Sequence, residues 1–188
     1  MSKIEYENDI SGAIESMRGS DNRANVSARS DNRAYYNSRD VQQCYTMTYE
    51  HTAAADGQYS FYLKNTSPDK TLVLSSVGLN CDTADSRFKL WFVSGTATDG
   101  VTKTPTNLNS ASSNAAAVTA LHDGGGTTIG GLTADKEIDY IFVAVNTHVE
   151  LRLFDRVRLG QNDAVALEFD ENSGGTADAG GVVFFYFE

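Results

Sequence analysis

Residues 149–188 read VELRLFDRVRLGQNDAVALEFDENSGGTADAGGVVFFYFE, and their hydrophobic pattern indicates the fold class of the chain. Between Leu151 and Leu159, aliphatic residues alternate with arginines, which is the period-two pattern of half-buried strands. The sequence Gly-Gln-Asn-Asp at 160–163 favours a tight turn, because glycine, asparagine and aspartate tolerate positive φ. An extended apolar pattern resumes at 164–169. We therefore expect antiparallel strands joined by a turn.

The run at 182–187, VVFFYF, is apolar on both faces of a strand. Neither face can be left in water, so we expect the opposing sheet to cover one face and a loop or a neighbouring subunit to cover the other. The chain is predicted to be all-β, an antiparallel β-sandwich whose last strand lies inside the structure.

Further segments rich in strand-favouring residues are separated by Gly, Asn, Asp and Pro. These segments are 44–50, 58–65, 71–79, 88–93, 115–122 and 137–146. The segment 115–122 is ambiguous between helix and strand, and its place between strands favours a strand. Roughly eight to ten short strands without βαβ alternation predict a jelly-roll-like sandwich over residues 41–188.

Length and composition limit the classes of protein to which the chain could belong. The 188 residues suffice for one domain with an appendage, and no apolar run reaches the roughly 20 residues that a membrane helix needs. The sequence MSKIEYENDISG at the N-terminus carries acids where a secretion signal would be basic and then apolar. Cys44 and Cys81 are two isolated cysteines, which we expect to be reduced, half-buried thiols.

Charge is distributed unevenly along the chain. The formal net charge is −10, yet the segment 16–39 holds five arginines against Asp21 and Asp31. Phosphate binding requires a basic surface, so the acidic body is not expected to bind nucleic acid. A basic segment on an acidic body favours contact with another copy of that body or with another acidic protein.

Residues 1–40 form a predicted N-terminal arm. Weak helical spacing of Ile10, Ile14 and Met17 allows at most a short helix over 4–17, and the sequence SDNRA at 20–24 recurs at 30–34. The segment cannot build its own core, so it is either a flexible polar leader or an extended arm ordered on a neighbouring subunit. We favour the arm, in which arginines grip carboxylates or carbonyls beside tyrosine anchors. Its interface residues would be Arg18, Arg23, Arg29, Arg33, Tyr35, Tyr36 and Arg39.

No constellation with convincing chemistry is found, and we predict no catalytic, cofactor-binding or metal-binding residues. His51, His122 and His148 lack partners at metal-ligand spacing. His122 and Asp123 could form a catalytic triad with a serine of the nearby loop. The sequence has no nucleophile elbow, so we do not predict a serine hydrolase.

The acidic groups are likewise not predicted to form a catalytic or metal-binding site. Asp135, Glu137 and Asp139 alternate along a strand, so two of them could share a face as a glycosidase carboxylate pair, but we favour a solvated strand edge. The acidic loops 82–85 and 170–172 lack calcium-loop spacing, and 124–128 lacks the lysine of a phosphate loop. Trp91 lies among apolar residues and is assigned to the core.

Three stretches together carry a family resemblance. Residues 61–79 read FYLKNTSPDKTLVLSSVGL, 88–96 read FKLWFVSGT and 102–109 read TKTPTNLN. With the strand around Leu167 and the closing FFYFE, this order resembles a loosely defined group of β-sandwich virion proteins of tailed bacteriophages, among them capsid decoration (cement) proteins. The likeness covers about residues 58–188, and TPTNLN is its most specific part.

The resemblance implies a non-enzymatic, structural role on the virus particle. Such a protein would be made in the host cytoplasm, form a homo-oligomer (a trimer is favoured), bind the major capsid protein and reinforce the shell at the capsid surface. A tail or fibre location is also open. The alternative is a carbohydrate- or receptor-binding β-sandwich module of a tail or fibre, with surface aromatic residues stacking on the ligand.

Overall fold

The computed structural model describes residues 5–7, 14–16, 37–82, 85–124, 127–171 and 177–188. The chain divides into two units, Met1–Asp31 and Asn32–Glu188. In the first unit, β1 (Glu5–Glu7) pairs antiparallel with β2 (Ile14–Ser16). The helix predicted over 4–17 is therefore wrong for these residues. Its few apolar side chains offered no continuous helical face, and short helices without packing are marginal in water.

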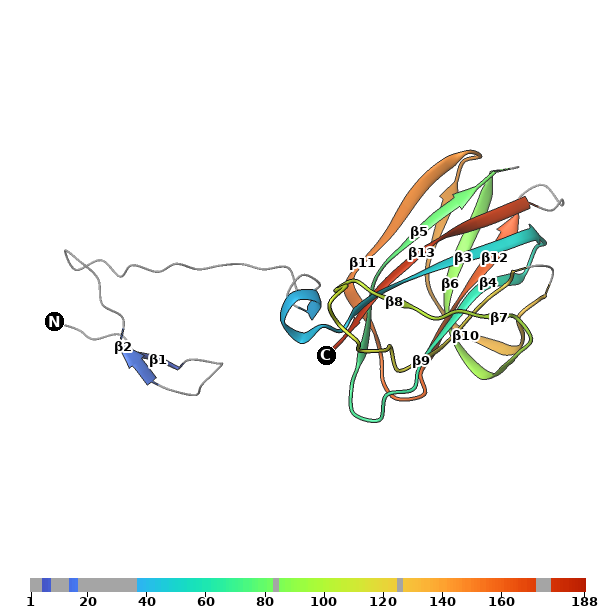
Figure 1. Ribbon diagram of the computed structural model, residues 1–188. Helices are drawn as coiled ribbons and strands as arrows, with labels where there is room; N and C mark the ends of the chain where they lie inside the picture. The colour runs from blue at the N-terminus through green and yellow to red at the C-terminus, as the bar shows by residue number, and fades with distance from the viewer. Residues whose placement is uncertain (1–4, 8–13, 17–36, 83–84, 125–126, 172–176) are drawn as a thin grey trace. The chain divides into compact units, whose positions relative to one another are not determined.

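The second unit is an antiparallel β-sandwich (Figure 1). One sheet has six strands in the order β10-β6-β12-β4-β9-β7, and the other has five in the order β11-β5-β13-β3-β8. A short π-helix, η1 (Asn37–Val41), precedes them. The strands are β3 (Cys44–Ala54), β4 (Gln58–Asn65), β5 (Leu72–Cys81), β6 (Ser86–Thr98), β7 (Val101–Thr102), β8 (Thr106–Asn107), β9 (Val118–His122), β10 (Gly130–Val143), β11 (Thr147–Leu159), β12 (Ala164–Glu171) and β13 (Ala177–Phe187).

The strand order is that of a jelly roll. The long strands form two sets of four, β3-β13-β5-β11 in one sheet and β4-β12-β6-β10 in the other. Connections that cross from sheet to sheet in this order are the double Greek key of the jelly roll. The prediction of an antiparallel, jelly-roll-like sandwich is confirmed. Among the described residues, no helix has the length and hydropathy that crossing a membrane would require.

The main core lies between the two sheets. Along β12, Val165, Leu167 and Phe169 are fully buried in it, while Ala164 and Ala166 point to the other side of the sheet. β13 supplies Val183, Phe185 and Phe187 to the same core, and the Phe185 ring stacks on Tyr45 with centroids 5.5 Å apart. β13 pairs with β5 on one side and β3 on the other, so the prediction that it lies inside the structure is confirmed.

The arginine-rich alternation of β11 is also confirmed. Leu151, Leu153, Val157 and Leu159 are buried, and the intervening arginines are exposed. The regular pairing with β5 is interrupted between Arg152 and Val157, where Phe154 and Asp155 have positive φ of 51° and 58°. This bulge lies on an edge strand and leaves Phe154 71% exposed.

Several strands are longer than predicted. β6 continues past Val93 to Thr98, and β10 begins at Gly130, where the sequence is polar and glycine-containing. Their pairing with each other holds these extensions. β3 likewise continues past residue 50 to Ala54, through residues expected to turn.

A second, smaller apolar cluster lies on the outer face of the six-stranded sheet. It contains Tyr62, Val93, Leu121, Ile129, Ala164 and Ala166. Trp91 is half-buried and packs against this cluster, so its assignment to the main core is wrong. Phe88 and Leu90 of β6 face the main core, and strand alternation turns Trp91 to the opposite face.

Candidate functional site

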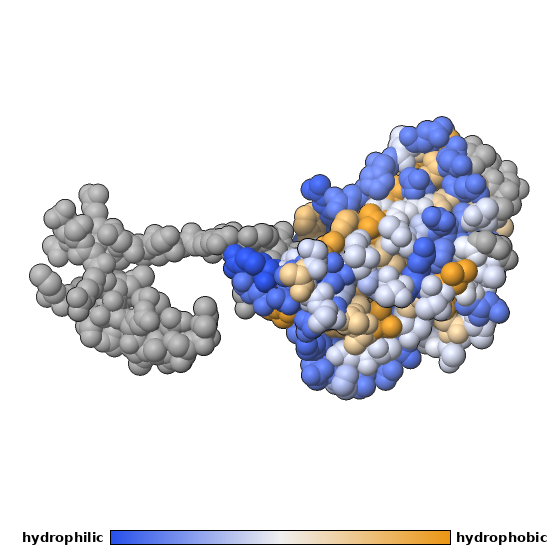
Figure 2. Space-filling view, viewed as in Figure 1, coloured by the Kyte–Doolittle hydropathy of each residue, from blue (hydrophilic) through white to orange (hydrophobic). Residues whose placement is uncertain are grey.

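An aromatic pair is exposed at the β10 edge of the six-stranded sheet. Tyr140 and Phe142 are 53% and 56% exposed, and their rings meet edge to face with centroids 5.9 Å apart. Ile141 is half-buried against the main core and Val143 is buried in it, so the two aromatic rings point outward. Apolar residues appear as separate areas among polar ones on the face seen in Figure 2. Adjacent exposed aromatic rings are typical of a surface that binds another molecule.

A cluster of ion pairs lies beside these rings. Phe142 is opposite Arg87, and Tyr140 is opposite Lys89. Arg87 forms an ion pair with Asp170 on β12, and Lys89 Nζ lies 2.6 Å from the same carboxylate. The Arg87 guanidinium also lies over the Phe142 ring, 6.0 Å from its centroid. We call Tyr140, Phe142, Arg87, Lys89 and Asp170 the outer-face patch.

The electrostatics of the patch favour charged side chains. Burial alone would raise the pKa of Asp170, but hydrogen bonds donated by Lys89 and Arg87, together with a hydrogen bond shared with Asp56, prevail and lower it to about 2. The same partner raises the pKa of Arg87 and of Lys89. The ion pairs are therefore present at neutral pH, and they order both cations next to the exposed rings.

A buried polar network connects β3, β4 and the segment after β9. His51 Nδ1 lies 2.9 Å from Ser60 Oγ, and His51 Nε2 lies 3.0 Å from Asp123 Oδ2 and 3.2 Å from Gln58 Oε1. Burial lowers the pKa of His51 and raises the pKa of Asp123 to about 6. The neutral imidazole then donates from Nε2 and accepts from Ser60 at Nδ1.

This network corrects the triad considered from the sequence. Asp123 meets His51 and Ser60 there, whereas the ring of His122 bonds through Nδ1 to the Glu50 carbonyl at 3.0 Å. Ser60 is fully buried and His51 is 1% exposed, so the hydroxyl has no access to a substrate. We interpret the group as an internal cross-link between strands.

The acidic candidates are not brought together in one site. Two β-bulges, one at Asp135 and one between Glu137 and Asp139, disturb the strand alternation that would align the three carboxylates. Asp82 and Asp85 accept hydrogen bonds from backbone amides, at 3.1 and 2.9 Å. Over the described ranges, no three His, Cys, Asp or Glu residues are grouped as a metal site would need. Cys44 and Cys81 are free and buried.

Most of the predicted arm interface lies outside the described residues. This applies to Arg18, Arg23, Arg29, Arg33, Tyr35 and Tyr36. Arg39 is described, and its Nε donates to Asp40 Oδ1 at 2.7 Å. Asn37, at the start of η1, is buried, and its carbonyl accepts from the Gln43 amide at 2.9 Å. The described end of the predicted arm is thus connected to the start of the sandwich.

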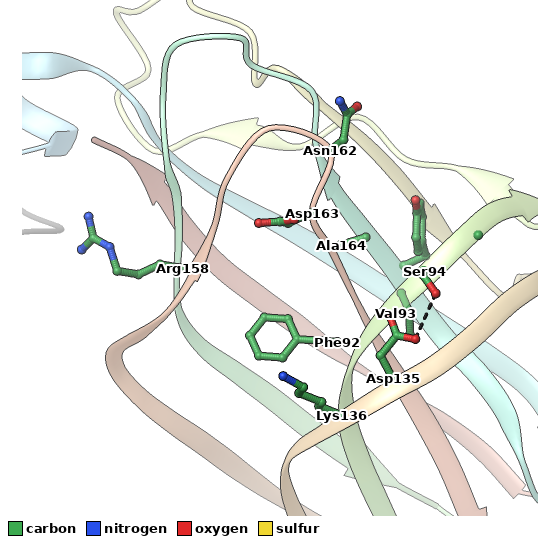
Figure 3. Close-up of a pocket in the computed structure, with 11 residues that line it drawn as sticks. Phe92, Val93, Ser94, Asp135, Lys136, Arg158, Asn162, Asp163 and Ala164 are labelled. Carbon is green, nitrogen blue, oxygen red and sulfur yellow. Dashed lines mark hydrogen bonds between the residues drawn. The ribbon is translucent and has the colours of Figure 1, made fainter.

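Sequence reasoning missed a pocket of about 540 Å³ beside the middle of β6 and β10 and the start of β12 (Figure 3). Its wall includes Phe92, Asp135, Lys136, Asn162 and Asp163. The sequence contained two signals, the Asn-Asp turn at 162–163 and the acidic, polar start of β10. Neither indicated that the fold would bring them to one place.

The comparisons with known proteins give no relatives. No family model matches the chain, and no similar protein was found among curated proteins or solved structures.

Proposed function

We propose that the chain is a non-enzymatic structural protein of a bacteriophage virion, a capsid decoration protein that binds across neighbouring capsid subunits and stabilises the shell. The observation that carries this proposal is the outer-face patch, with its two exposed aromatic rings beside ordered ion pairs. The sequence resemblance over residues 58–188 points to the same class. The jelly-roll order adds support by analogy, since this topology recurs in viral capsid proteins.

The patch has the composition of a binding surface with an aromatic centre and a charged rim. Covering the exposed halves of Tyr140 and Phe142 would contribute about 2–3 kcal/mol each. The ion pairs beside them are already formed, so a partner does not have to order their side chains. A few such anchors, surrounded by weaker contacts, account for most of the affinity of a typical interface.

Several weak contacts are enough for stable attachment to the shell when copies of the protein are joined in an oligomer. In a trimer, three patches would attach to the shell together, and dissociation would require all three to release. Binding to the assembled shell in preference to free capsid subunits stabilises the shell through linkage. The basic segment 16–39 would extend this reach to acidic neighbours at the cost of being ordered.

The test measures occupancy on the heads of the phage that encodes the chain, stripped of this protein. Heads are incubated with the full chain or with the Tyr140→Ala/Phe142→Ala variant, and bound copies are counted by quantitative gel and by electron microscopy. Only part of the roughly 4–6 kcal/mol of apolar contact appears as binding free energy, so we expect the variant to bind at least tenfold more weakly.

The matched control is Val101→Ala, a 40% exposed residue on β7 at the opposite edge of the same sheet. It should bind like the unchanged chain. Equal occupancy of the double variant, or no binding of the unchanged chain to any head, would overturn the proposal.

A further inference from the structure

The pocket of Figure 3 is lined mainly by β6, β10 and the turn between β11 and β12, and Tyr62 of β4 also borders it. Phe92 on β6 and Lys136 on β10 are direct cross-strand neighbours, so their side chains share one wall. Asn162 and Asp163 come from the turn between β11 and β12. Asp135 is the extra residue of a β-bulge between Ala134 and Lys136. Bulges re-aim side chains, and here the Asp135 carboxylate accepts a hydrogen bond from Ser94 Oγ at 3.0 Å.

The wall is held in place before any ligand arrives. The Asn162 amide donates to the Asn65 carbonyl at 2.8 Å, and the Asp163 carbonyl accepts from the Asn65 amide at 3.0 Å. Asp163 Oδ2 also accepts from the Gly160 amide at 2.9 Å. These bonds hold the backbone of the turn against the end of β4, and the Gly160 amide orients the Asp163 carboxylate. A preformed site binds a ligand without paying for loop ordering.

The polar groups of the pocket are balanced between donors and acceptors. Asp135 and Asp163 each use one carboxylate oxygen in the bonds above, which leaves the other oxygen able to accept. Lys136 offers an ammonium group that forms no ion pair within the described part of the chain, and Asn162 offers an exposed amide. Arg158 also borders the pocket, but its guanidinium points away from Phe92 and lies 2.5 Å from Glu188 (Figure 3).

We propose that this pocket binds a neutral saccharide. A phosphate or carboxylate ligand would meet two carboxylates, and a cationic ligand would meet Lys136, so neither charge sign is favoured. Hydroxyl groups both donate and accept, and they match carboxylate oxygens, an amide and an ammonium group at once. The half-buried phenyl ring of Phe92 can pack against the apolar face of a sugar ring. A volume of about 540 Å³ lies within the usual range for small-ligand sites.

This inference goes beyond the shell-binding role. The pocket and the outer-face patch share no residue. A particle surface covered with such a protein would carry many weak glycan contacts, which together bind strongly to a polysaccharide through multivalency.

The experiment uses the full chain and four neutral trisaccharides, maltotriose, cellotriose, tri-N-acetylchitotriose and mannotriose, at millimolar concentration. Binding is detected by saturation-transfer NMR and quantified by calorimetry. We expect at least one trisaccharide to bind, and Asp135→Ala to weaken that binding about tenfold or more by removing a charged acceptor. Asn162→Gly removes the amide and tolerates the positive φ of 69° at this position, and it should weaken binding as well.

The matched control is Glu137→Gln, an exposed carboxylate on the same strand that does not border the pocket. It should bind the trisaccharide with unchanged affinity. The proposal is overturned if no neutral trisaccharide binds, if only charged probes such as sialyllactose or spermidine bind, or if both pocket variants bind like the unchanged chain. Head occupancy measured on Asp135→Ala should stay unchanged, which separates a failure here from a failure of the shell-binding role.

Discussion

Replacing Asp123 with asparagine should make the sandwich more stable at neutral pH, although it removes a side chain that is buried next to His51. Asp123 is 2% exposed, and its Oδ2 lies 3.0 Å from His51 Nε2. Asparagine has nearly the same shape, and Asp123 Oδ2 has no hydrogen-bond partner among the described residues that the substitution would remove. The substitution therefore removes a buried charge and leaves the packing in place.

The magnitude follows from the pKa of Asp123, which burial raises from 3.8 to about 6. Between these values the unfolded chain has released the proton and the folded chain keeps it, so stability falls as the pH rises. The whole interval corresponds to at most about 3 kcal/mol. His51 acts in the opposite direction. Burial lowers its pKa, so stability falls as the pH drops below about 6.5. Because His51 is buried in both proteins, the effect of its burial largely cancels in the comparison, which leaves the contribution of Asp123 and of its contact with His51.

The free energy of unfolding should be measured by guanidinium titration, with Trp91 fluorescence as the signal, from about pH 4 to about pH 7. The value for Asp123→Asn minus that for the unchanged chain should increase over this range by up to about 3 kcal/mol. Asp99→Asn, an exposed turn residue, serves as control and should give a flat difference. A difference that decreases with rising pH would refute the reasoning, because it would mean that ionised Asp123 stabilises a protonated His51.

Three further outcomes are expected. Phe169→Ala should lower the free energy of unfolding by about 3–5 kcal/mol, because this ring is fully buried. Phe154→Ala should lower it by less than about 1 kcal/mol, because this ring is 71% exposed, and denaturant titration measures both values. Gly181→Ala should cost at least about 3 kcal/mol or prevent folding, since a Cβ atom there would overlap the Gly78 carbonyl oxygen, and its melting temperature or soluble yield would show this. Deleting residues 1–36 should change the melting temperature of the sandwich by no more than a few degrees and should reduce head occupancy. Equal occupancy of the truncated and the full chain would contradict a binding role for the arm.

Much of the fold could be predicted from local pattern. The predicted bounds 58–65 are those of β4, and the alternation around Leu151 placed the faces of β11 correctly. Trp91 could not be placed, because Phe88, Leu90, Trp91 and Phe92 are apolar on both faces of the strand and the pattern does not say which face meets the core. The polar extension of β6 to Thr98 is held by backbone pairing with β10. Such pairing needs no hydrophobic pattern, so the sequence does not reveal it.

The candidate sites were harder to predict for a different reason. His51, Ser60 and Asp123 are distant in sequence and come from three segments, so only the paired strands bring them into contact. The outer-face patch depends equally on the register that sets Phe142 opposite Arg87. Sequence reasoning found the residue types and not their neighbours.

The position of β13 has a consequence for how the molecule folds. β3 and β5 do not pair with each other, and β13, which follows both in the chain, is the strand that joins them in one sheet. During synthesis, the ribosome releases both strands before the strand that joins them exists. Such long-range pairing is slow to form, so the nascent chain exposes unpaired edges for a time. We expect chaperones to matter more for the yield of this protein than for a helical domain of equal length.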